Sequence, residues 1–348
     1  IESNIKQVTQ WMRPEIQSMS QGMVHYTLPQ EVVNTTFSNL QSNVLIHKYG
    51  PIEGHPELLS LLKQKFETKN KLTNREVMLS CGANQGFFSV VLSLCDPGDE
   101  VILLAPFFFN HKMAIQLCNV TPVVVRCKED LSLDLEAIRK AITSKTKMVV
   151  LVTPSNPSGH VESKESIQQL QKLCLESNIW LISDEAYEYF VYEDNTSHYS
   201  ADGPNVINLF SFSKGHGMPG WRVGYLAYPP HLKSALDKVQ DTVPINVCQF
   251  SQQMAISALK YGDEWIHERV RALKQQRELV WDAVKDCPGT IKTAGALYFL
   301  IKLPEGVNEL KAVEYLATQW KVLLIPCSEE SCGLKGYIRV SYANLTLE

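Results

Sequence analysis

The sequence predicts an α/β fold: a mostly parallel central sheet in a large domain, together with a smaller α+β domain. Between about residues 74 and 228, short apolar runs alternate with helical patterns of roughly 10–15 residues, the arrangement typical of parallel sheets. The runs are apolar throughout, as expected for strands that are covered on both faces. The chain has 348 residues and 45% hydrophobic side chains, which is enough for about two domains with buried cores.

The predicted elements of the large domain follow from local patterns in chain order. Residues 76–80 form a β-rich run, and residues 84–95 carry apolar side chains at helical spacing. The turn Asp-Pro-Gly-Asp at 96–99 separates this helix from the next strand. The same reasoning predicts later strands at 100–104, 121–126, 148–153, 179–183, 206–210 and 223–228. It predicts further helices at about 110–118, 134–142 and 163–177.

Beyond about residue 230 the pattern changes to long helices and shorter strands. A helix rich in charge is expected at 262–285, followed by strands at 297–301, 322–325 and 337–340. We assign the large domain to 33–260 and the small domain to 1–32 together with 261–348. No Ser- or Gly-rich linker separates the two, so we expect a shared interface, where small-molecule sites tend to form.

The composition argues against several classes of function. The 33 basic and 37 acidic side chains give a net charge of −4 without a basic run, so binding to nucleic acid or a membrane surface is not expected. The longest apolar stretch, 101–109, is far too short to span a bilayer. Nine scattered cysteines without a CxxC pair indicate small buried side chains, and argue against a disulfide framework or a metal site. We expect a cytoplasmic protein, with an organelle left open because a leader could have been trimmed.

The segment 211–225 carries the strongest chemical signal. Lys214 leaves the end of an apolar strand after two serines and beside glycines, where weak hydration would lower its pKa and make its amine nucleophilic. On local grounds alone, a lysine that extends from a strand end into solvent is an alternative. Residues 215–220 also match the G-x-G-x-x-G spacing of dinucleotide-binding turns. However, Pro219 and Gly220 break a helix and a strand follows, so the required strand–turn–helix context is missing.

Three further turns are expected at the same edge of the sheet. Asn156 follows a buried strand, and Asp184 and Tyr187 come at the end of the next one. The carboxyl ends of parallel strands line the ligand crevice, so these side chains would converge with Lys214. Asp184 would be a buried carboxylate that needs a cation, unless it caps a helix or turn. The strand-to-helix turn at 81–87 offers free backbone amides, which suit a phosphate group.

Together these segments resemble the class I/II aminotransferases that use pyridoxal 5′-phosphate, on the fold called type I. The match runs from Gly22 to Arg339 and rests on S-x-S-K-x7-R, with N-P-x-G and D-x-x-Y upstream. The resemblance implies that Lys214 binds the cofactor covalently and moves the substrate proton, and that Asp184 pairs with the pyridine nitrogen. It also implies a final helix after Arg339; since the chain stops nine residues later, we expect that helix to be missing.

The resemblance assigns the other cofactor contacts. Tyr187 and Asn156 would hydrogen-bond the phenolic oxygen, and Phe108 would stack on the pyridine ring, while either neighbouring phenylalanine could be plain core. The phosphate group would be bound by Ser211, Ser213, Arg222 and the backbone amides of Ala83 and Asn84. No metal is implied.

The implied substrate contacts lie in distant parts of the chain. Arg339 would bind the α-carboxylate bidentately, with Asn156 beside it and a backbone amide contributed by Gly22. Tyr49 resembles the tyrosine that reaches the cofactor phosphate of the neighbouring subunit. A homodimer with two shared active sites is therefore expected.

The resemblance implies a ping-pong transfer of the amino group from an amino acid to a 2-oxo acid, through pyridoxamine phosphate. Aspartate-specific relatives carry a second arginine after the lysine turn, but none occurs between Arg222 and Arg269. The candidate pocket side chains favour methionine or aromatic donors: Met23, Val24, Tyr26, Tyr49 and Phe107. The nearest sub-families are plant-type methionine/aromatic aminotransferases, then kynurenine/glutamine transaminases. The alternatives are a C–S β-lyase or related α-carbanion enzyme on the same fold, and a binding protein without turnover.

Overall fold

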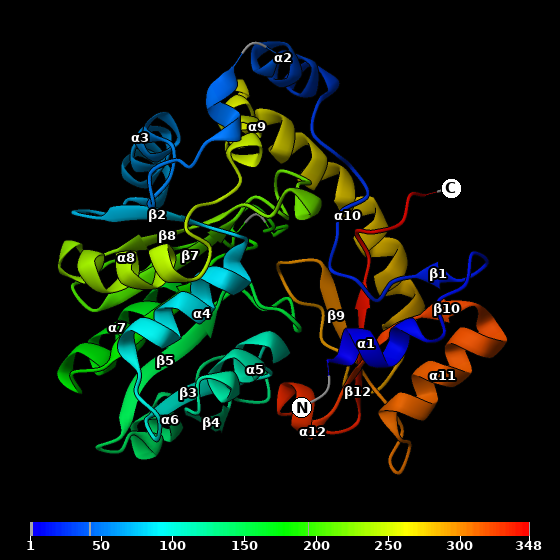
Figure 1. Cartoon of the computed structure of the whole chain (residues 1–348). Helices are drawn as coiled ribbons and strands as arrows, with labels where there is room; N and C mark the ends of the chain where they lie inside the picture. Colours follow the sequence, from blue (N-terminus) through cyan, green and yellow to red (C-terminus); the bar gives the residue numbers. More distant parts are fainter. Residues whose placement is uncertain (1–2, 42, 194, 348) are drawn as a thin grey trace.

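The computed structural model describes residues 3–41, 43–193 and 195–347. Its largest feature is a seven-stranded sheet in the order β2-β8-β7-β6-β5-β3-β4 (Figure 1). Strand β8 pairs antiparallel with β2 and with β7, and the other four pairs are parallel, so the predicted α/β fold with a mostly parallel sheet is confirmed. The strands are β2 (Glu76–Ser80), β3 (Glu100–Ala105), β4 (Thr121–Arg126), β5 (Thr146–Val152), β6 (Trp180–Asp184), β7 (Val206–Ser211) and β8 (Gly224–Tyr228).

Helices cover both faces of this large sheet, because its central strands bury side chains on both sides. In β3, Val101 and Leu103 pack with α4, α5 and α8, whereas Ile102 and Leu104 pack with α6 and α7. On that second face, α3 and α9 cover the end formed by β2, β8 and β7. The helices are α3 (Pro56–Lys65), α4 (Ala83–Leu94), α5 (Phe109–Leu117), α6 (Leu135–Ala141), α7 (Lys164–Glu176), α8 (Lys233–Thr242) and α9 (Gln249–Tyr261).

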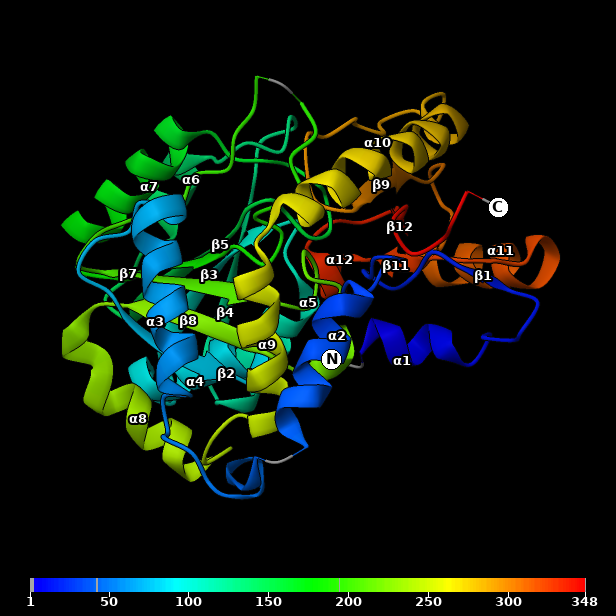
Figure 2. The ribbon, with the colours of Figure 1, turned by 90° about the horizontal axis from the view of Figure 1, so that it is seen from above.

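A smaller antiparallel sheet, in the order β11-β12-β9, lies beside the large one (Figure 2). Its strands are β9 (Tyr298–Lys302), β11 (Ile325–Cys327) and β12 (Tyr337–Ser341). The N-terminal segment joins this region through β1 (Gln17–Ser18), which pairs in parallel with β10 (Val322–Leu323). The helices here are α1 (Asn4–Thr9), α10 (Glu264–Val284), α11 (Glu309–Trp320) and α12 (Glu329–Cys332).

Most predicted elements agree with the structure to within two residues at each end. One prediction is wrong: the single strand expected at 322–325 is two short strands, β10 and β11. The chain turns at Leu324 because β10 pairs with β1 while β11 pairs with β12, so the two strands belong to different sheets. Strand β8 departs from the parallel arrangement. The segment between β7 and β8 holds only the three-residue η3, which is too short for the crossover helix that joins parallel neighbours.

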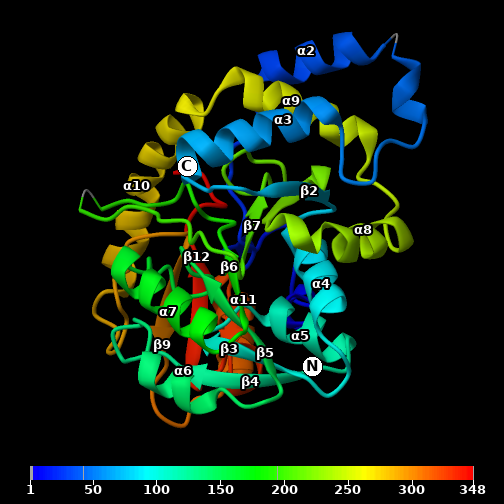
Figure 3. The same cartoon turned by 90° about the vertical axis from the view of Figure 1, so that its left-hand side faces the viewer.

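The remaining elements lie at the edge of the large sheet. They are α2 (Gln30–Leu40), η1 (Val44–His47), η2 (Phe66–Asn70), η3 (Pro219–Trp221) and η4 (Pro230–Leu232). Helix α2 lies along α9, where the rings of Phe37 and Phe250 are 5.4 Å apart (Figure 3). None of the helices in the described ranges is long and apolar enough to cross a membrane. All nine cysteines are free. The expectation that they are buried holds for Cys174, Cys327 and Cys332, whereas Cys248 is exposed and the other five are partly exposed.

Candidate active site

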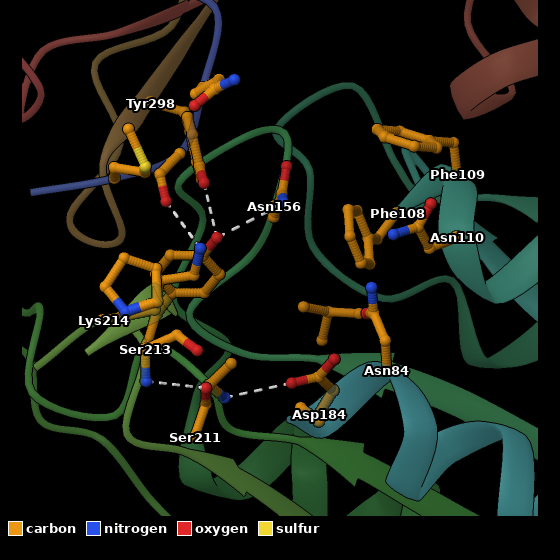
Figure 4. A pocket seen from close by; sticks show the side chains of 18 of the residues that line it. Asn84, Phe108, Phe109, Asn110, Asn156, Asp184, Ser211, Ser213, Lys214 and Tyr298 are labelled. Atoms are coloured by element: carbon orange, nitrogen blue, oxygen red, sulfur yellow. Dashed lines mark hydrogen bonds between the residues drawn. The ribbon is translucent and has the colours of Figure 1, made fainter. Parts of the chain in front are cut away.

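A pocket of about 270 Å³ lies where the carboxyl ends of the large-sheet strands meet the small sheet and the N-terminal segment (Figure 4). Lys214 follows β7, Asp184 ends β6, and Arg339 comes from the middle of β12. Every residue to which the resemblance assigns a catalytic, cofactor or α-carboxylate contact lines this pocket, except Tyr49. Residues that the sequence did not indicate also line it, among them Ile5, Phe109 and Tyr298.

Lys214 carries a free amine into the centre of the pocket. Its Nζ donates a hydrogen bond to the Gly22 carbonyl oxygen at 2.6 Å and lies 5.6 Å from the centre of the Tyr187 ring. Desolvation by burial, followed by the positive charges of Arg339 and Arg222, lowers the pKa of Lys214 to about 8, and Asp184 opposes this shift. A sizeable fraction of the amine is therefore neutral near physiological pH and able to attack an aldehyde.

Asp184 is a buried carboxylate with two firm contacts. One oxygen accepts the backbone N–H of Ala186 at 3.0 Å, and the other lies 3.1 Å from Nε2 of His111. His111 is itself buried, and its ring centre lies 4.2 Å from that of Phe87, so the imidazole is held in place from behind. His111 therefore gives this buried carboxylate a hydrogen-bond partner inside the protein. It was not predicted from the sequence, although its position three residues after Phe108, in the first turn of a helix, was a usable signal.

Tyr187 lies between the two sides of the pocket. Its hydroxyl is 3.4 Å from Nδ2 of Asn156 and 2.5 Å from the hydroxyl of Tyr298. The Asn156 amide is oriented by a second contact, because its Oδ1 accepts Nη1 of Arg339 at 2.7 Å. Hydrogen bonds therefore link Arg339, Asn156 and Tyr187 in a row, and the Tyr187 ring at the end of this row lies 5.6 Å from Nζ of Lys214.

The start of α4 forms the anion-binding end of the pocket. Gly82 is the N-cap residue, with φ at 83°, and no side chain caps this helix within the described residues. The first backbone amides, those of Ala83 and Asn84, consequently point out of the helix without the intrahelical partners that later amides have. Free amides at a helix start favour a negatively charged ligand such as phosphate.

Arg222 supplies a positive charge at the same end. Its Nη2 contacts the Cys81 carbonyl oxygen at 3.3 Å, and a Cβ atom built on Gly82 would come within 2.3 Å of this nitrogen. A side chain at position 82 would therefore displace the guanidinium group, and the positive φ of this position also favours glycine. Ser211 and Ser213 are buried beside it, and Oγ of Ser211 accepts the Ser213 backbone N–H at 3.1 Å.

Arg339 provides the opposite charged end. It is buried, and within the described chain no carboxylate forms an ion pair with it. Its Nη2 donates to the Ser20 carbonyl oxygen at 2.5 Å, while its buried Nε has no partner. A buried guanidinium without a carboxylate is costly, so this site is suited to an anionic ligand that the protein does not itself supply.

These groups fit pyridoxal 5′-phosphate in their chemistry. Free amides and Arg222 suit the phosphate, the carboxylate of Asp184 suits a protonated pyridine nitrogen, and Lys214 suits the aldehyde. The pocket also leaves an unpaired Arg339 for the carboxylate of an amino acid. The roles of the individual residues remain predictions that follow from this fit.

Some of the predicted substrate contacts are wrong. Of the side chains proposed to surround the substrate, only Met23 lines the pocket. Val24 and Tyr26 lie in the core beneath the small sheet, and Phe107 lies in the core of the large sheet, because β-strand and loop neighbours enclose them. Tyr49 is 82% exposed; its predicted contact, with the cofactor phosphate of a neighbouring subunit, stays a prediction. Ile5 and Phe109 take their places among the apolar lining.

The chain is similar to known proteins over nearly its whole length. A family model described as aminotransferase class I and II matches residues 15–348. The aromatic aminotransferase ISS1 of Arabidopsis thaliana is 38% identical over 340 residues, which are 94% of this chain and 85% of that protein. A probable aspartate/prephenate aminotransferase of Aquifex aeolicus is 31% identical over 313 residues, 85% of this chain and 79% of that protein.

Solved structures give the same result. The crystal structure of the aromatic aminotransferase from Pyrococcus horikoshii OT3 matches with a TM-score of 0.89 and 28% identity. The match covers 99% of this chain and 94% of that one, so it includes the large sheet, the small sheet and the pocket between them.

Proposed function

We propose a detailed function from one premise: the chain belongs to the aminotransferase class I and II family. It is a pyridoxal phosphate-dependent enzyme that transfers the amino group of an amino acid to a 2-oxo acid. We propose that its preferred donors have neutral aromatic or methionine side chains, and that Lys214, Asp184 and Tyr187 act on the reacting atoms. The observation that carries this proposal is Arg339, a buried guanidinium without a carboxylate partner in the described chain, which lines the same pocket as Lys214.

The pocket residues divide the catalytic work between them. When bound, pyridoxal 5′-phosphate supplies an aldehyde for the amino group and a ring that withdraws electrons from the substrate Cα. Arg339 binds the substrate α-carboxylate and so orients the Cα–H bond. Lys214 Nζ, in the neutral form that its lowered pKa makes more abundant, would accept the proton from Cα. Asp184, held by His111 at 3.1 Å, would face the pyridine nitrogen and pair with it.

The lining of the pocket supports a donor with a neutral side chain. Its positive charges within the described residues are those of Lys214, Arg222 and Arg339, and each of them has a role above. Among the described residues, no further cation lines the space next to Ile5, Met23 and Phe109, where a second carboxylate would remain unpaired. Apolar lining of this kind favours aromatic rings and thioethers.

A single-turnover screen tests the donor preference. Stoichiometric holoenzyme is mixed with one donor, and the conversion of bound pyridoxal phosphate to pyridoxamine phosphate is followed by absorbance. Phenylalanine, tryptophan and methionine are expected to react faster than aspartate, which serves as the matched anionic donor. A faster reaction with aspartate would exclude the proposed preference. A C–S β-lyase is not favoured by the named relatives; release of pyruvate and ammonia from a cysteine conjugate without any 2-oxo acid would identify one.

We also propose that the enzyme is a homodimer built from two domains per chain, 33–260 and 1–32 with 261–348. Val44 and Leu45 are 70% and 65% exposed and lie close in sequence to the exposed Tyr49. Neighbouring exposed apolar side chains are typical of an interface. Light scattering after gel filtration should give about twice the chain mass of 39.3 kDa, and Leu45→Glu should lower it. A fully active monomer would contradict the shared site.

A further inference from the structure

Tyr298 is a pocket residue whose role the family motifs do not specify. It is the first residue of β9 and is completely buried, with its hydroxyl 2.5 Å from the hydroxyl of Tyr187 (Figure 4). The N-terminal segment packs directly on this hydroxyl, because a Cβ built on Gly22 would come within 1.7 Å of it. Glycine at position 22 therefore leaves the space that the Tyr298 hydroxyl occupies.

The hydrogen bonds around Tyr187 decide where its single proton points. A tyrosine hydroxyl donates once and accepts through its lone pairs. Asn156 can only donate toward Tyr187, because its Oδ1 is taken by Arg339 and its Nδ2 faces the hydroxyl. If Tyr298 also donates, the Tyr187 proton is left free to be donated to a ligand in the pocket. If Tyr298 accepts instead, that proton is used within the protein.

Charge around the two rings favours Tyr298 as the donor. The guanidinium carbon of Arg339 lies 4.4 Å from the centre of the Tyr298 ring, where a cation is attracted by the ring face. Burial raises the pKa of Tyr298, while Arg339 and the bond with Tyr187 act to lower it. Burial and Tyr298 raise the pKa of Tyr187 well above its usual value. The guanidinium of Arg339 lies directly over the Tyr298 ring but reaches Tyr187 only through Asn156, so Tyr298 is the hydroxyl that this charge polarises more strongly and the better donor.

We propose that Tyr298 is a positioning residue of this active site: its hydroxyl donates to Tyr187, keeps the Tyr187 proton directed into the pocket, and links that proton to Arg339. The inference rests on the proposed function, because Tyr187 is taken to bind the cofactor phenolic oxygen. The charged groups that face the pair are Arg339 from β12, Lys214 from the loop after β7, and Asp184 from the end of β6. When a substrate carboxylate neutralises Arg339, Tyr298 becomes a weaker donor, and the bond from Tyr187 to the ligand weakens with it.

The test is a pH titration of the absorbance of the enzyme-bound cofactor, in the parent holoenzyme and in Tyr298→Phe. A hydrogen bond donated to the phenolic oxygen stabilises its negative charge, so loss of Tyr298 should raise the apparent pKa by about 0.5–1 pH unit. Saturating 3-phenylpropionate, a carboxylate without an amino group, should raise the pKa of the parent and raise that of Tyr298→Phe by less.

Tyr342→Phe is the matched control. Tyr342 is equally buried, donates to the Ala296 carbonyl oxygen at 2.9 Å and lies outside the pocket lining, so its loss should leave the apparent pKa unchanged. Gly22→Ala is a second variant, which displaces the Tyr298 hydroxyl from the other side and should shift the pKa in the same direction. An unchanged pKa in both pocket variants, or an equal shift in Tyr342→Phe, overturns the inference. A parent protein that binds no pyridoxal phosphate overturns the proposed function instead.

Discussion

The two walls of the pocket are built in different ways. The large-sheet wall consists of residues at strand ends and at the start of α4, among them Asp184, Lys214 and Arg222. The small-sheet wall consists of Arg339, Tyr298 and the N-terminal segment around Gly22, which are far apart in sequence. The first wall is positioned by the order of parallel strands, and the second by long-range pairing of β1 with β10 and of β12 with β9.

This difference separates two tasks. The large-sheet wall holds groups suited to the cofactor, which is the same for every substrate. The small-sheet wall holds the unpaired guanidinium and part of the apolar lining, which are suited to the substrate. We therefore expect substitutions in the first wall to affect all donors alike, and substitutions in the second to depend on the carboxylate or side chain of the donor.

Replacement of Lys214 by alanine should produce the largest effect. Turnover should fall by at least about 10³-fold with every amino donor, because the variant lacks both the nucleophilic amine and the group that moves the proton. Pyridoxal phosphate should still bind, since the helix start and Arg222 are unchanged. Steady-state rates and equilibrium dialysis check both points. Lys233→Ala, which removes a surface lysine paired with Glu53 and Asp237, should keep parental rates.

Among substitutions in the small-sheet wall, Arg339→Gln should lower kcat/KM the most. Loss of a buried partner for the substrate carboxylate should lower kcat/KM by about 30- to 1,000-fold, equivalent to about 2–4 kcal/mol. The loss should vanish with 2-phenylethylamine, which has no carboxylate. Arg126→Gln, which breaks an exposed pair with Glu329, is the control. Equal losses with the amine and with phenylalanine would show that Arg339 only supports the fold.

His111→Phe, a substitution in the large-sheet wall, should have a smaller effect, on the affinity for pyridoxal phosphate. The ring still fills the space beside Phe87, but Asp184 loses the donor at 3.1 Å. Affinity for pyridoxal phosphate should fall by about 10- to 100-fold, in line with the loss of a hydrogen bond to a charged group. The effect should be the same for every donor. His231 is exposed, so His231→Phe is the control and should keep the parental affinity. Unchanged affinity in His111→Phe would show that the contact between His111 and Asp184 does not contribute to cofactor binding.

The same difference between the walls explains how much the sequence predicted. Strand ends follow from local patterns, so Asp184, Asn156 and Lys214 could be brought together before any coordinates were known. His111 and Tyr298 escaped notice because their importance depends on which atoms face them across the fold, and neither lies in a distinctive motif. The substrate side of the pocket was predicted least well. Val24, Tyr26 and Phe107 are apolar like pocket residues, and only packing decides that they belong to the core.

The smallest expected effect is on the pKa of Lys214, whose Nζ is influenced by charges from both walls of the pocket. In the apoenzyme, modification of Lys214 by pyridoxal, followed by mass spectrometry, should increase as pH rises through about 8, because below that pH the amine is protonated and unreactive. An ordinary lysine would titrate near about 10.4. Arg339→Gln removes a positive charge that lowers the pKa of Lys214, so the midpoint should rise. Asp184→Asn removes a negative charge that raises it, so the midpoint should fall. Shifts of the same sign in both variants would mean that general loosening of the pocket, and not opposed charges from its two walls, sets the reactivity of the amine.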